Sequence, residues 1–104
     1  MWDIAYSAEA QADLVDIYVY LAWDLGAPQV ANHIEEAIRS RIRSLAEYPL
    51  RHRVLDDLAM GTVQVRVTKV GNYEIFYHAD ELTNSVVVVR ILYAGRDIAE
   101  QLRG

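Results

Sequence analysis

The side chains best suited to chemistry in this sequence of 104 residues are arginines. Six of them fall close together along the chain, at Arg39, Arg41, Arg43, Arg51, Arg53 and Arg66. Guanidinium groups bind phosphates and carboxylates, so this region could stabilise charge on a phosphate or hold an acidic partner. Residues 1–36 show the opposite charge, with seven acidic residues and no Lys or Arg. Because the net charge of the whole chain is −5, we expect no broad nucleic-acid-binding surface.

Other common catalytic and ligand-binding patterns are missing from the sequence. The three histidines, at His33, His52 and His78, do not have metal-ligand spacing, and there is no cysteine. No nucleophile elbow, Walker-type glycine loop or zinc-protease motif occurs. We therefore expect neither a metal nor a cofactor. No apolar run approaches the roughly 20 residues that span a bilayer, and no signal-peptide pattern opens the chain, so we expect a cytoplasmic protein without a membrane partner.

The first half of the chain predicts a strand followed by a helical hairpin. Apolar and polar residues alternate over residues 2–6, which is typical of a strand. Ser7 is placed to cap a helix that reaches residue 25, because apolar residues recur there at spacings of three and four. Gly26 ends this helix, and a second apolar stripe over 28–45 predicts another. Since the connection is short, the two helices must run antiparallel.

The second half predicts a small β-sheet. Strands are expected over 62–68, 73–78 and 86–93, joined by polar turns, as a three-stranded antiparallel meander. The segment 50–61 shows no regular pattern, and Asp97 could cap a short final helical turn. The whole chain, residues 1–104, is one domain. The predicted fold class is α+β, in which the helical hairpin packs on one face of an antiparallel sheet that the N-terminal strand and the meander form together.

Several motifs at this spacing resemble those of one protein family. These are G-x-Y-x-I-F-Y at 71–77, R-I-L-Y-x-G-R-D at 90–97, the opening W-x-I-x-Y-S, and the stretch 39–49. Together they resemble toxins of the RelE/ParE superfamily from bacterial type II toxin–antitoxin modules, and the resemblance covers essentially the whole chain. It implies a cognate antitoxin, ParD-like or similar, whose C-terminal part wraps the toxin as a helix and an extended segment.

The superfamily contains two activities, and the sequence favours one of them. RelE-like members cut mRNA in the ribosome with basic residues on the open sheet face, and Arg66 and Arg96 would match two of these. Glu74, however, stands where that pattern has an Arg, and the tail 99–104 has neither Tyr nor His. The better match is the ParE-like branch, which implies inhibition of DNA gyrase by binding. A ribosome-dependent endoribonuclease stays the alternative, and a decayed toxin that only binds antitoxin is a third possibility.

Candidate contacts with the cellular target follow from the charges and aromatic rings near the sheet. They are Arg66, Tyr73, Arg90, Tyr93 and Arg96. Structural roles stay open for each kind of residue. Arg96 could pair with Asp97 or Glu74, Arg90 could be a partly buried residue paired with an acid, and aromatic rings at strand spacing commonly belong to the core.

Candidate contacts with the antitoxin lie on the helical hairpin. Tyr20 and Trp23 could anchor a partner helix, because grooves that bind amphipathic helices use large aromatic side chains. Arg39 and Arg43 could hold an acidic partner. The alternatives are that Trp23 only covers the end of the hairpin and that the arginines pair with glutamates on the same helix.

Overall fold

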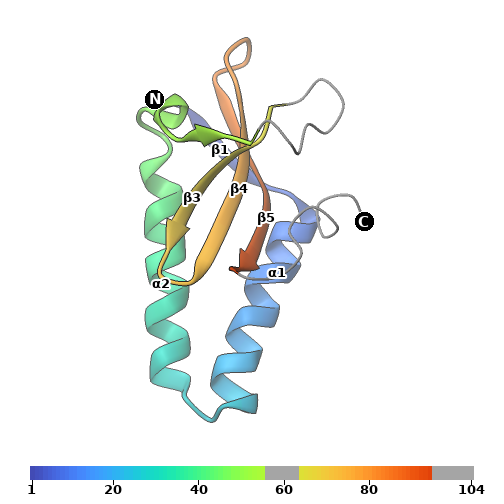
Figure 1. Ribbon diagram of the computed structural model, residues 1–104, viewed down its shortest axis with the longest axis vertical. Coiled ribbons are helices and arrows are strands. Elements are labelled where there is room, and N and C mark those ends of the chain that lie inside the picture. The colour runs from blue at the N-terminus through green and yellow to red at the C-terminus, as the bar shows by residue number, and fades with distance from the viewer. Residues whose placement is uncertain (56–63, 95–104) are drawn as a thin grey trace.

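The computed structural model describes residues 1–55 and 64–94 (Figure 1). Within them the elements are β1 (Asp3–Tyr6), α1 (Ala8–Val19), the π-helix η1 (Tyr20–Asp24), α2 (Pro28–Ser44), the 3-10 helix η2 (Pro49–Arg51), β2 (Arg53–Val54), β3 (Arg66–Val70), β4 (Tyr73–Asp80) and β5 (Ser85–Tyr93). This order confirms the predicted α+β class. The predicted final helical turn after Asp97 lies outside the described residues.

Local signals explain where the helical hairpin begins and turns. Ser7 caps α1, since its hydroxyl oxygen accepts a hydrogen bond from the backbone N–H of Ala10 at 3.0 Å. Gly26 has φ +63°, a left-handed conformation that glycine adopts without steric cost, and Pro28 occupies the first turn of α2. The hairpin therefore forms where the sequence predicts it.

The two helices pack side by side on one face of the sheet (Figure 1). Their apolar stripes meet the sheet in one buried cluster, whose members are Ala10, Leu14, Ile38, Ile42, Tyr73, Ile75, Val88 and Ile91. Burial of this apolar surface is the main favourable contribution to folding. Three partly buried residues pack at the margin of the same cluster, Ile17 of α1 and Ile4 and Tyr6 of β1.

The sheet has the strand order β1-β5-β4-β3-β2. β3, β4 and β5 form the predicted antiparallel meander. The prediction of a purely antiparallel sheet is corrected at β1, which pairs parallel with β5 and makes the sheet mixed. The reason is that the helical hairpin returns the chain to the end where β1 begins, as the hydrogen bond from Trp2 N to Ala46 O shows. β3 therefore starts at the same end of the sheet as β1 and runs in the same direction. β4 runs back, and β5 again runs in the direction of β1.

β2 is a strand of two residues that the sequence does not predict. Arg53 lies opposite Val67 and Val54 lies opposite Arg66, so β2 forms the edge of the sheet beside β3. Two residues are too short to display a period of two, which is why the pattern over this segment looks irregular.

The face of the sheet that points away from the helices also carries an apolar cluster. Val67 and Phe76 lie opposite each other in the register, and they cluster with Val65 and Leu92. Successive side chains of a strand alternate between faces, so Phe76 points away from the helices while Ile75 points toward them. We call this second face the open face because no helix of the hairpin packs on it, although the four residues of this cluster are each at most 6% exposed. No helix in the described ranges is long and apolar enough to cross a membrane.

Candidate partner-binding groove

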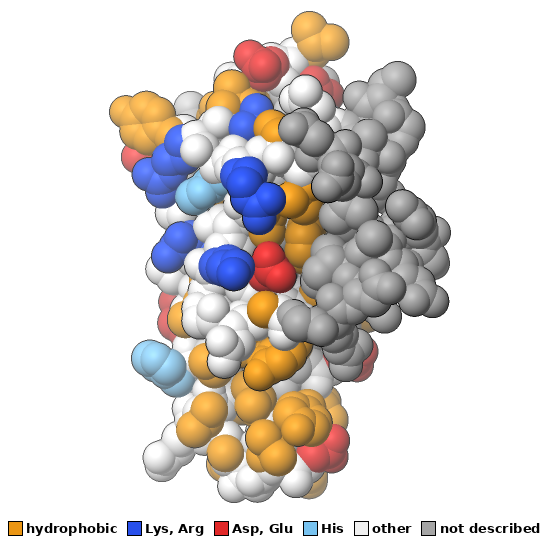
Figure 2. All heavy atoms as spheres, viewed as in Figure 1, with side chains coloured by type: hydrophobic (Ala, Val, Ile, Leu, Met, Phe, Trp, Pro, Cys, Tyr) orange, Lys and Arg blue, Asp and Glu red, His pale blue; other side chains and the backbone are white. Residues whose placement is uncertain are grey.

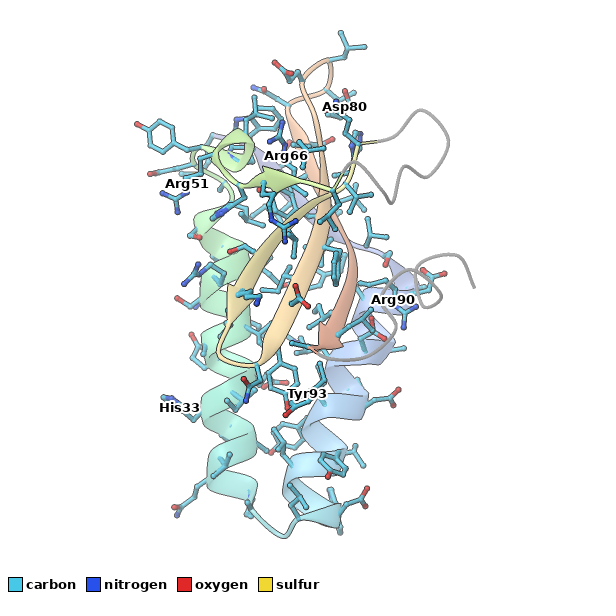
Figure 3. The ribbon with its side chains drawn as sticks, viewed as in Figure 1. His33, Arg51, Arg66, Asp80, Arg90 and Tyr93 are labelled. Atoms are coloured by element: carbon cyan, nitrogen blue, oxygen red, sulfur yellow. The ribbon has the colours of Figure 1, made fainter. Side chains whose placement is uncertain are left out.

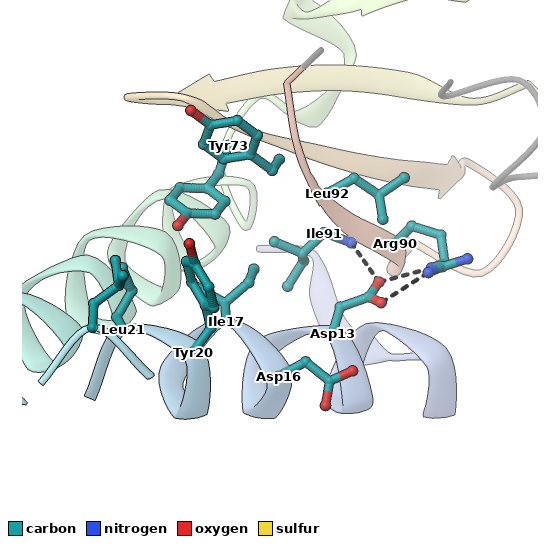
Figure 4. A pocket seen from close by; sticks show the side chains of 11 residues that line it. Asp13, Asp16, Ile17, Tyr20, Leu21, Tyr73, Arg90, Ile91 and Leu92 are labelled. Carbon is teal, nitrogen blue, oxygen red and sulfur yellow. Dashed lines mark hydrogen bonds and ion pairs between the residues drawn. The ribbon is translucent and has the colours of Figure 1, made fainter. Parts of the chain in front are cut away.

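A groove lies between the C-terminal half of the first helix and the ends of β4 and β5 (Figure 4). Its volume is about 790 Å³. Its lining residues are Asp13, Asp16, Ile17, Tyr20, Leu21, Leu25, Tyr73, Arg90, Ile91, Leu92 and Tyr93. The lining combines apolar side chains, three phenol groups, two carboxylates and the guanidinium of Arg90, a mixture that suits a protein-binding surface.

Three tyrosines from different elements form the aromatic wall of this groove. Tyr73 and Tyr93 lie opposite each other on β4 and β5, and their rings meet edge to face with centroids 5.5 Å apart. Tyr20 of η1 points toward Tyr73 in Figure 4. Burial raises the pKa of Tyr73 above its usual value, and its neighbours Tyr93 and Tyr20 raise it further. Neutral phenols can each donate and accept a hydrogen bond, so this wall can bind both apolar and polar groups of a partner.

The position of Tyr20 depends on the π-helix that ends the first helix. Leu25 N donates to Tyr20 O at 2.9 Å, an i to i+5 hydrogen bond that widens the last turn. In this turn Leu21 is buried, Tyr20 is half exposed beside the groove, and Trp23 is 78% exposed and does not line the groove. Because π-helices occur frequently at functional sites, this turn is a reason to examine Tyr20 as a contact residue. The apolar periodicity alone does not predict it.

An ion pair joins the two walls of the groove at its other end. Arg90 Nε donates to Asp13 Oδ2 at 2.7 Å and Arg90 Nη2 donates to Asp13 Oδ1 at 2.9 Å (Figure 4). The hydrogen bond to Asp13 raises the pKa of Arg90, although burial opposes this shift. The sequence alternative in which Arg90 pairs with an acid is therefore confirmed. Asp13 as its partner was not predicted, since nothing in the acidic stripe of α1 distinguishes it.

A β-bulge sets the direction in which Arg90 points. Tyr77 lies opposite Val88 whereas Phe76 lies opposite Arg90, so Val89 is an extra residue in β5. The bulge shifts the alternation of β5 by one residue. Ile91 consequently joins the core under the helices, and Arg90 shares the open face with Phe76 before its guanidinium reaches Asp13 at the edge of the sheet.

The structure places two of the candidate antitoxin contacts away from the groove. Arg39 pairs with Glu35 at 3.9 Å and lies over the ring of Tyr6, with 5.8 Å between Arg39 Cζ and the ring centroid. Arg43 Nη2 lies 2.6 Å from an oxygen of Glu36. Both arginines therefore make the contacts with glutamates that the alternative interpretation predicts. Their role toward an antitoxin stays a prediction.

Arg66 is held by backbone carbonyls beneath the edge of the sheet. It lies opposite Tyr77, a buried residue that packs toward the helices, so its side chain starts on the helix side. One terminal nitrogen donates to Leu50 O at 2.9 Å and to His52 O at 2.8 Å. This guanidinium therefore fixes the segment before β2 (Figure 3). Arg96, the second cation expected to meet a phosphate, lies outside the described residues.

The open face carries basic side chains over β2 and β3, shown in blue in Figure 2. By register, Arg53 shares the face of Val67, and Lys69 lies opposite Glu74. Glu74 thus places a negative charge in the middle of this face. Phe76 and Tyr77 belong to the core, as the structural alternative predicts, whereas Tyr93 is half exposed. The structure therefore brings Tyr20, Tyr73, Arg90 and Tyr93 together in the groove and leaves Arg66 apart from them.

Comparisons with known proteins agree with this fold. Residues 4–98 match the model of the family described as ParE toxin of type II toxin-antitoxin system, parDE. The structure is similar to a chain of the chromosomal ParDE system from P. aeruginosa, with a TM-score of 0.73 and 18% identity over 90% of this chain and 97% of that chain. No curated protein sequence matches the chain.

Two further structural relatives come from the RelE side of the superfamily. One is a RelBE toxin–antitoxin complex from Mycobacterium tuberculosis, with a TM-score of 0.63 and 18% identity over 88% of this chain and 96% of that chain. The other is the isolated E. coli RelE toxin, with a TM-score of 0.60 and 13% identity over 97% of this chain and 93% of that chain. At these identities the likeness concerns the fold alone.

The family match, together with the fold, places the protein among the small α+β toxins of type II toxin–antitoxin modules. Within this class the chain belongs to the ParE toxin family, since the family model covers most of its length.

Proposed function

We propose that this protein is a ParE-like toxin that inhibits DNA gyrase by binding to it, and that a cognate, ParD-like antitoxin neutralises the toxin by occupying the groove. The antitoxin part of the proposal is supported by the shape and lining of the groove. Ile17, Leu21 and the three tyrosines offer the apolar surface that an amphipathic helix buries. The described relatives include toxin–antitoxin complexes, which supports the same assignment.

The observation that supports gyrase rather than mRNA as the target is that the side chain of Arg66 is already engaged within the fold. Its guanidinium donates to two backbone carbonyls, and Glu74 lies on the open face where a phosphate would have to bind. Phosphate cleavage needs cations aimed at the developing negative charge and a group that transfers protons. Among the described residues, this face therefore offers a poor phosphate-cleaving site. Inhibition by binding requires no such group.

One observation favours the alternative, a ribosome-dependent endoribonuclease. Arg53 and Lys69 lie on the open face and could contact an RNA backbone. Purified protein distinguishes the two functions when it is added to gyrase with relaxed plasmid and, separately, to ribosomes that are translating a defined mRNA. We expect supercoiling to stop and the mRNA to stay intact. Supercoiling at the normal rate together with mRNA cleavage would establish the endoribonuclease instead.

The same assays test the antitoxin. Addition of the antitoxin encoded beside this gene should restore supercoiling in proportion to the complex formed. If the protein binds this antitoxin but affects neither gyrase nor mRNA, it is a decayed toxin. Failure to bind the antitoxin would remove the groove from the proposal, whatever the target is.

A further inference from the structure

The N-terminus lies beside the end of α2 (Figure 1), and a second apolar surface is found there, with no residue in common with the groove. A hollow of about 460 Å³ opens there, and its lining residues are Met1, Trp2, Ala46, Glu47, Tyr48, Pro49, Leu50 and Arg51. Met1 is 91% exposed, Tyr48 is 74% exposed and Leu50 is 38% exposed. We call this the Tyr48 surface. It exposes an apolar group of side chains around a hollow that is wide enough to admit a large side chain.

Tyr48 is held in this exposed position by an unfavourable backbone conformation. Its φ of 56° and ψ of 50° lie in the left-handed region, where a β-carbon collides with the backbone. Glycine or asparagine adopts this conformation at lower cost, and the turn of β4–β5 indeed uses Asn84 at φ 55°. The large ring therefore gains little inside the fold. Such an outlier at a surface position indicates a role for the side chain outside the fold.

The surroundings of this surface are positively charged. Arg51 lines the hollow, and a terminal nitrogen of Arg66 donates to the carbonyl oxygen of Leu50, another lining residue, at 2.9 Å. The pKa of the neighbouring His52 is lowered by burial first, and then by Arg51, Arg41 and Arg66. Glu47 is the one acid among the lining residues. α1 and η1, by contrast, carry acidic residues and no basic residue.

We propose that the Tyr48 surface binds an acidic segment of a partner protein that inserts an apolar side chain, such as Phe or Leu, into the hollow beside Arg51. Tyr and Arg, with Trp, are enriched among the residues that contribute most of the binding free energy at protein interfaces, and such residues lie in or beside well-packed pockets. Carboxylates that flank the inserted side chain complement the arginines. This site goes beyond the proposed function, because neither gyrase inhibition nor the antitoxin groove requires it.

A protein segment fits this surface better than a nucleic acid does. The apolar hollow lies at the centre and the cations lie on one side of it, whereas a nucleic acid needs a continuous line of cations along its backbone. A long polyanion would also be repelled by a chain with a net charge of −5. A short acidic segment contacts only the local positive charge.

The experiment uses a library of random peptides displayed on phage. The library is first depleted on the full-length Tyr48→Gly variant and then selected on the wild-type protein. Glycine adopts the left-handed conformation, so this variant keeps the fold while it loses the ring, and circular dichroism should show a melting temperature no lower than that of the wild type. We expect the recovered peptides to carry Asp or Glu beside Phe, Leu, Ile or Met. A synthetic copy of a recovered peptide should bind Tyr48→Gly and Arg51→Gln about tenfold more weakly than the wild type.

Leu82→Ala is the matched control, because Leu82 is a large apolar residue that is 98% exposed in the β4–β5 turn. It should bind the peptide as the wild type does. The proposal would be overturned if the recovered peptides were basic or wholly polar. It would also be overturned if no peptide were enriched on the wild-type protein relative to Tyr48→Gly. Single-stranded oligothymidylate is tested in parallel. If it binds and Tyr48→Gly weakens that binding, the surface is a nucleic-acid site and the proposal is wrong.

Discussion

Arg90 of β5 and Asp13 of α1, which are 77 positions apart in the sequence, form a bidentate ion pair at the edge of the sheet. Asp13 Oδ2 also accepts a hydrogen bond from the backbone N–H of Ile91 at 2.9 Å. β1 covers the edge of β5 only as far as Val88, and beyond it side chains take over, since Ser7 Oγ donates to Val89 O and Asp13 accepts from Ile91 N. One carboxylate therefore fastens α1 to β5 and protects an exposed strand edge.

Replacement of this carboxylate should destabilise the fold strongly. The side chains of Arg90 and Asp13 are only 19% and 11% exposed, and Asp13→Ala removes the two charge-assisted hydrogen bonds between them together with the acceptor of Ile91 N. We expect the free energy of unfolding in urea to fall by about 3 kcal/mol. Asp16→Ala, at an exposed position of the same helix, is the matched control and should change stability by no more than about 0.5 kcal/mol. Equal effects of the two substitutions would contradict the role given to Asp13.

The hydroxyl of Ser7 should contribute more than a helix cap alone. It accepts from Ala10 N at 3.0 Å and donates to the carbonyl of Val89, the bulge residue, at 2.7 Å. Ser7→Ala removes both hydrogen bonds, and we expect a loss of about 2 kcal/mol in urea denaturation. Ser40→Ala, on the exposed side of α2, should stay within about 0.5 kcal/mol of the wild type. A loss below that of a cap alone, about 1 kcal/mol, would show that the bond to the bulge contributes nothing.

Apolar periodicity in the sequence predicts the helices and strands that are long enough to bury residues at a regular spacing. The two helices and the β3–β5 meander belong to this group, because their buried residues recur at 3.6 or 2. The short strand β2 and the π-helix η1 contain too few residues for a period. The parallel pairing of β1 depends on where a distant hairpin returns the chain, which no local pattern contains.

The candidate groove was only partly predictable for a related reason. Tyr20, Tyr73 and Tyr93 were each selected from the sequence, but as parts of two separate sites. Because Val89 is an extra residue in β5, the side chains after it point to the opposite face from the one that strict alternation predicts. Tyr93 therefore lies beside Tyr73 on the helix side. A bulge of this kind leaves no mark on the apolar pattern of Val86–Leu92. Pairing of Arg90 with Asp13 likewise needs the tertiary structure.

Within the groove, Tyr20 should matter more to antitoxin binding than Trp23. Tyr20 lines the groove with Tyr73, whereas Trp23 is 78% exposed and is not among the lining residues. We expect Tyr20→Ala to weaken binding of the cognate antitoxin about 30-fold, since loss of a central aromatic contact costs about 2 kcal/mol. Trp23→Ala should weaken it less than about threefold. Isothermal titration with the purified antitoxin measures both, and a larger effect of Trp23→Ala would place the interface on the outer side of the hairpin.

Alkaline pH should destabilise the protein through Tyr77. Burial raises the pKa of Tyr77 to about 12 from 10.0, although Arg66 and Arg51 oppose this shift. Between about pH 10 and about pH 12 the unfolded chain therefore loses this proton before the folded chain does, and the free energy of unfolding falls as the pH rises. Urea denaturation across this range measures the slope.

The slope should become shallower in Tyr77→Phe, which cannot ionise at this position. This variant should also be less stable at neutral pH by about 1 kcal/mol, because Pro49 O loses the hydrogen bond from the Tyr77 hydroxyl. Tyr48→Phe, which removes a phenol hydroxyl from a ring that is 74% exposed, is the matched control. An unchanged slope in Tyr77→Phe would assign the alkaline transition to other groups.

The backbone at Tyr48 predicts an unusual order of stability among its variants. In most positions alanine is more stable than glycine, because glycine has more conformational freedom in the unfolded chain. At φ 56° the β-carbon of alanine meets the same steric conflict as that of tyrosine, while glycine avoids it. We therefore expect Tyr48→Gly to be more stable than Tyr48→Ala by about 1 kcal/mol in urea denaturation. Ser40→Gly and Ser40→Ala, inside α2, should show the reverse order by a similar amount of about 1 kcal/mol. If Tyr48→Ala were the more stable of its pair, the left-handed conformation would carry no cost, and the strain that points to an external role for the tyrosine ring would not exist.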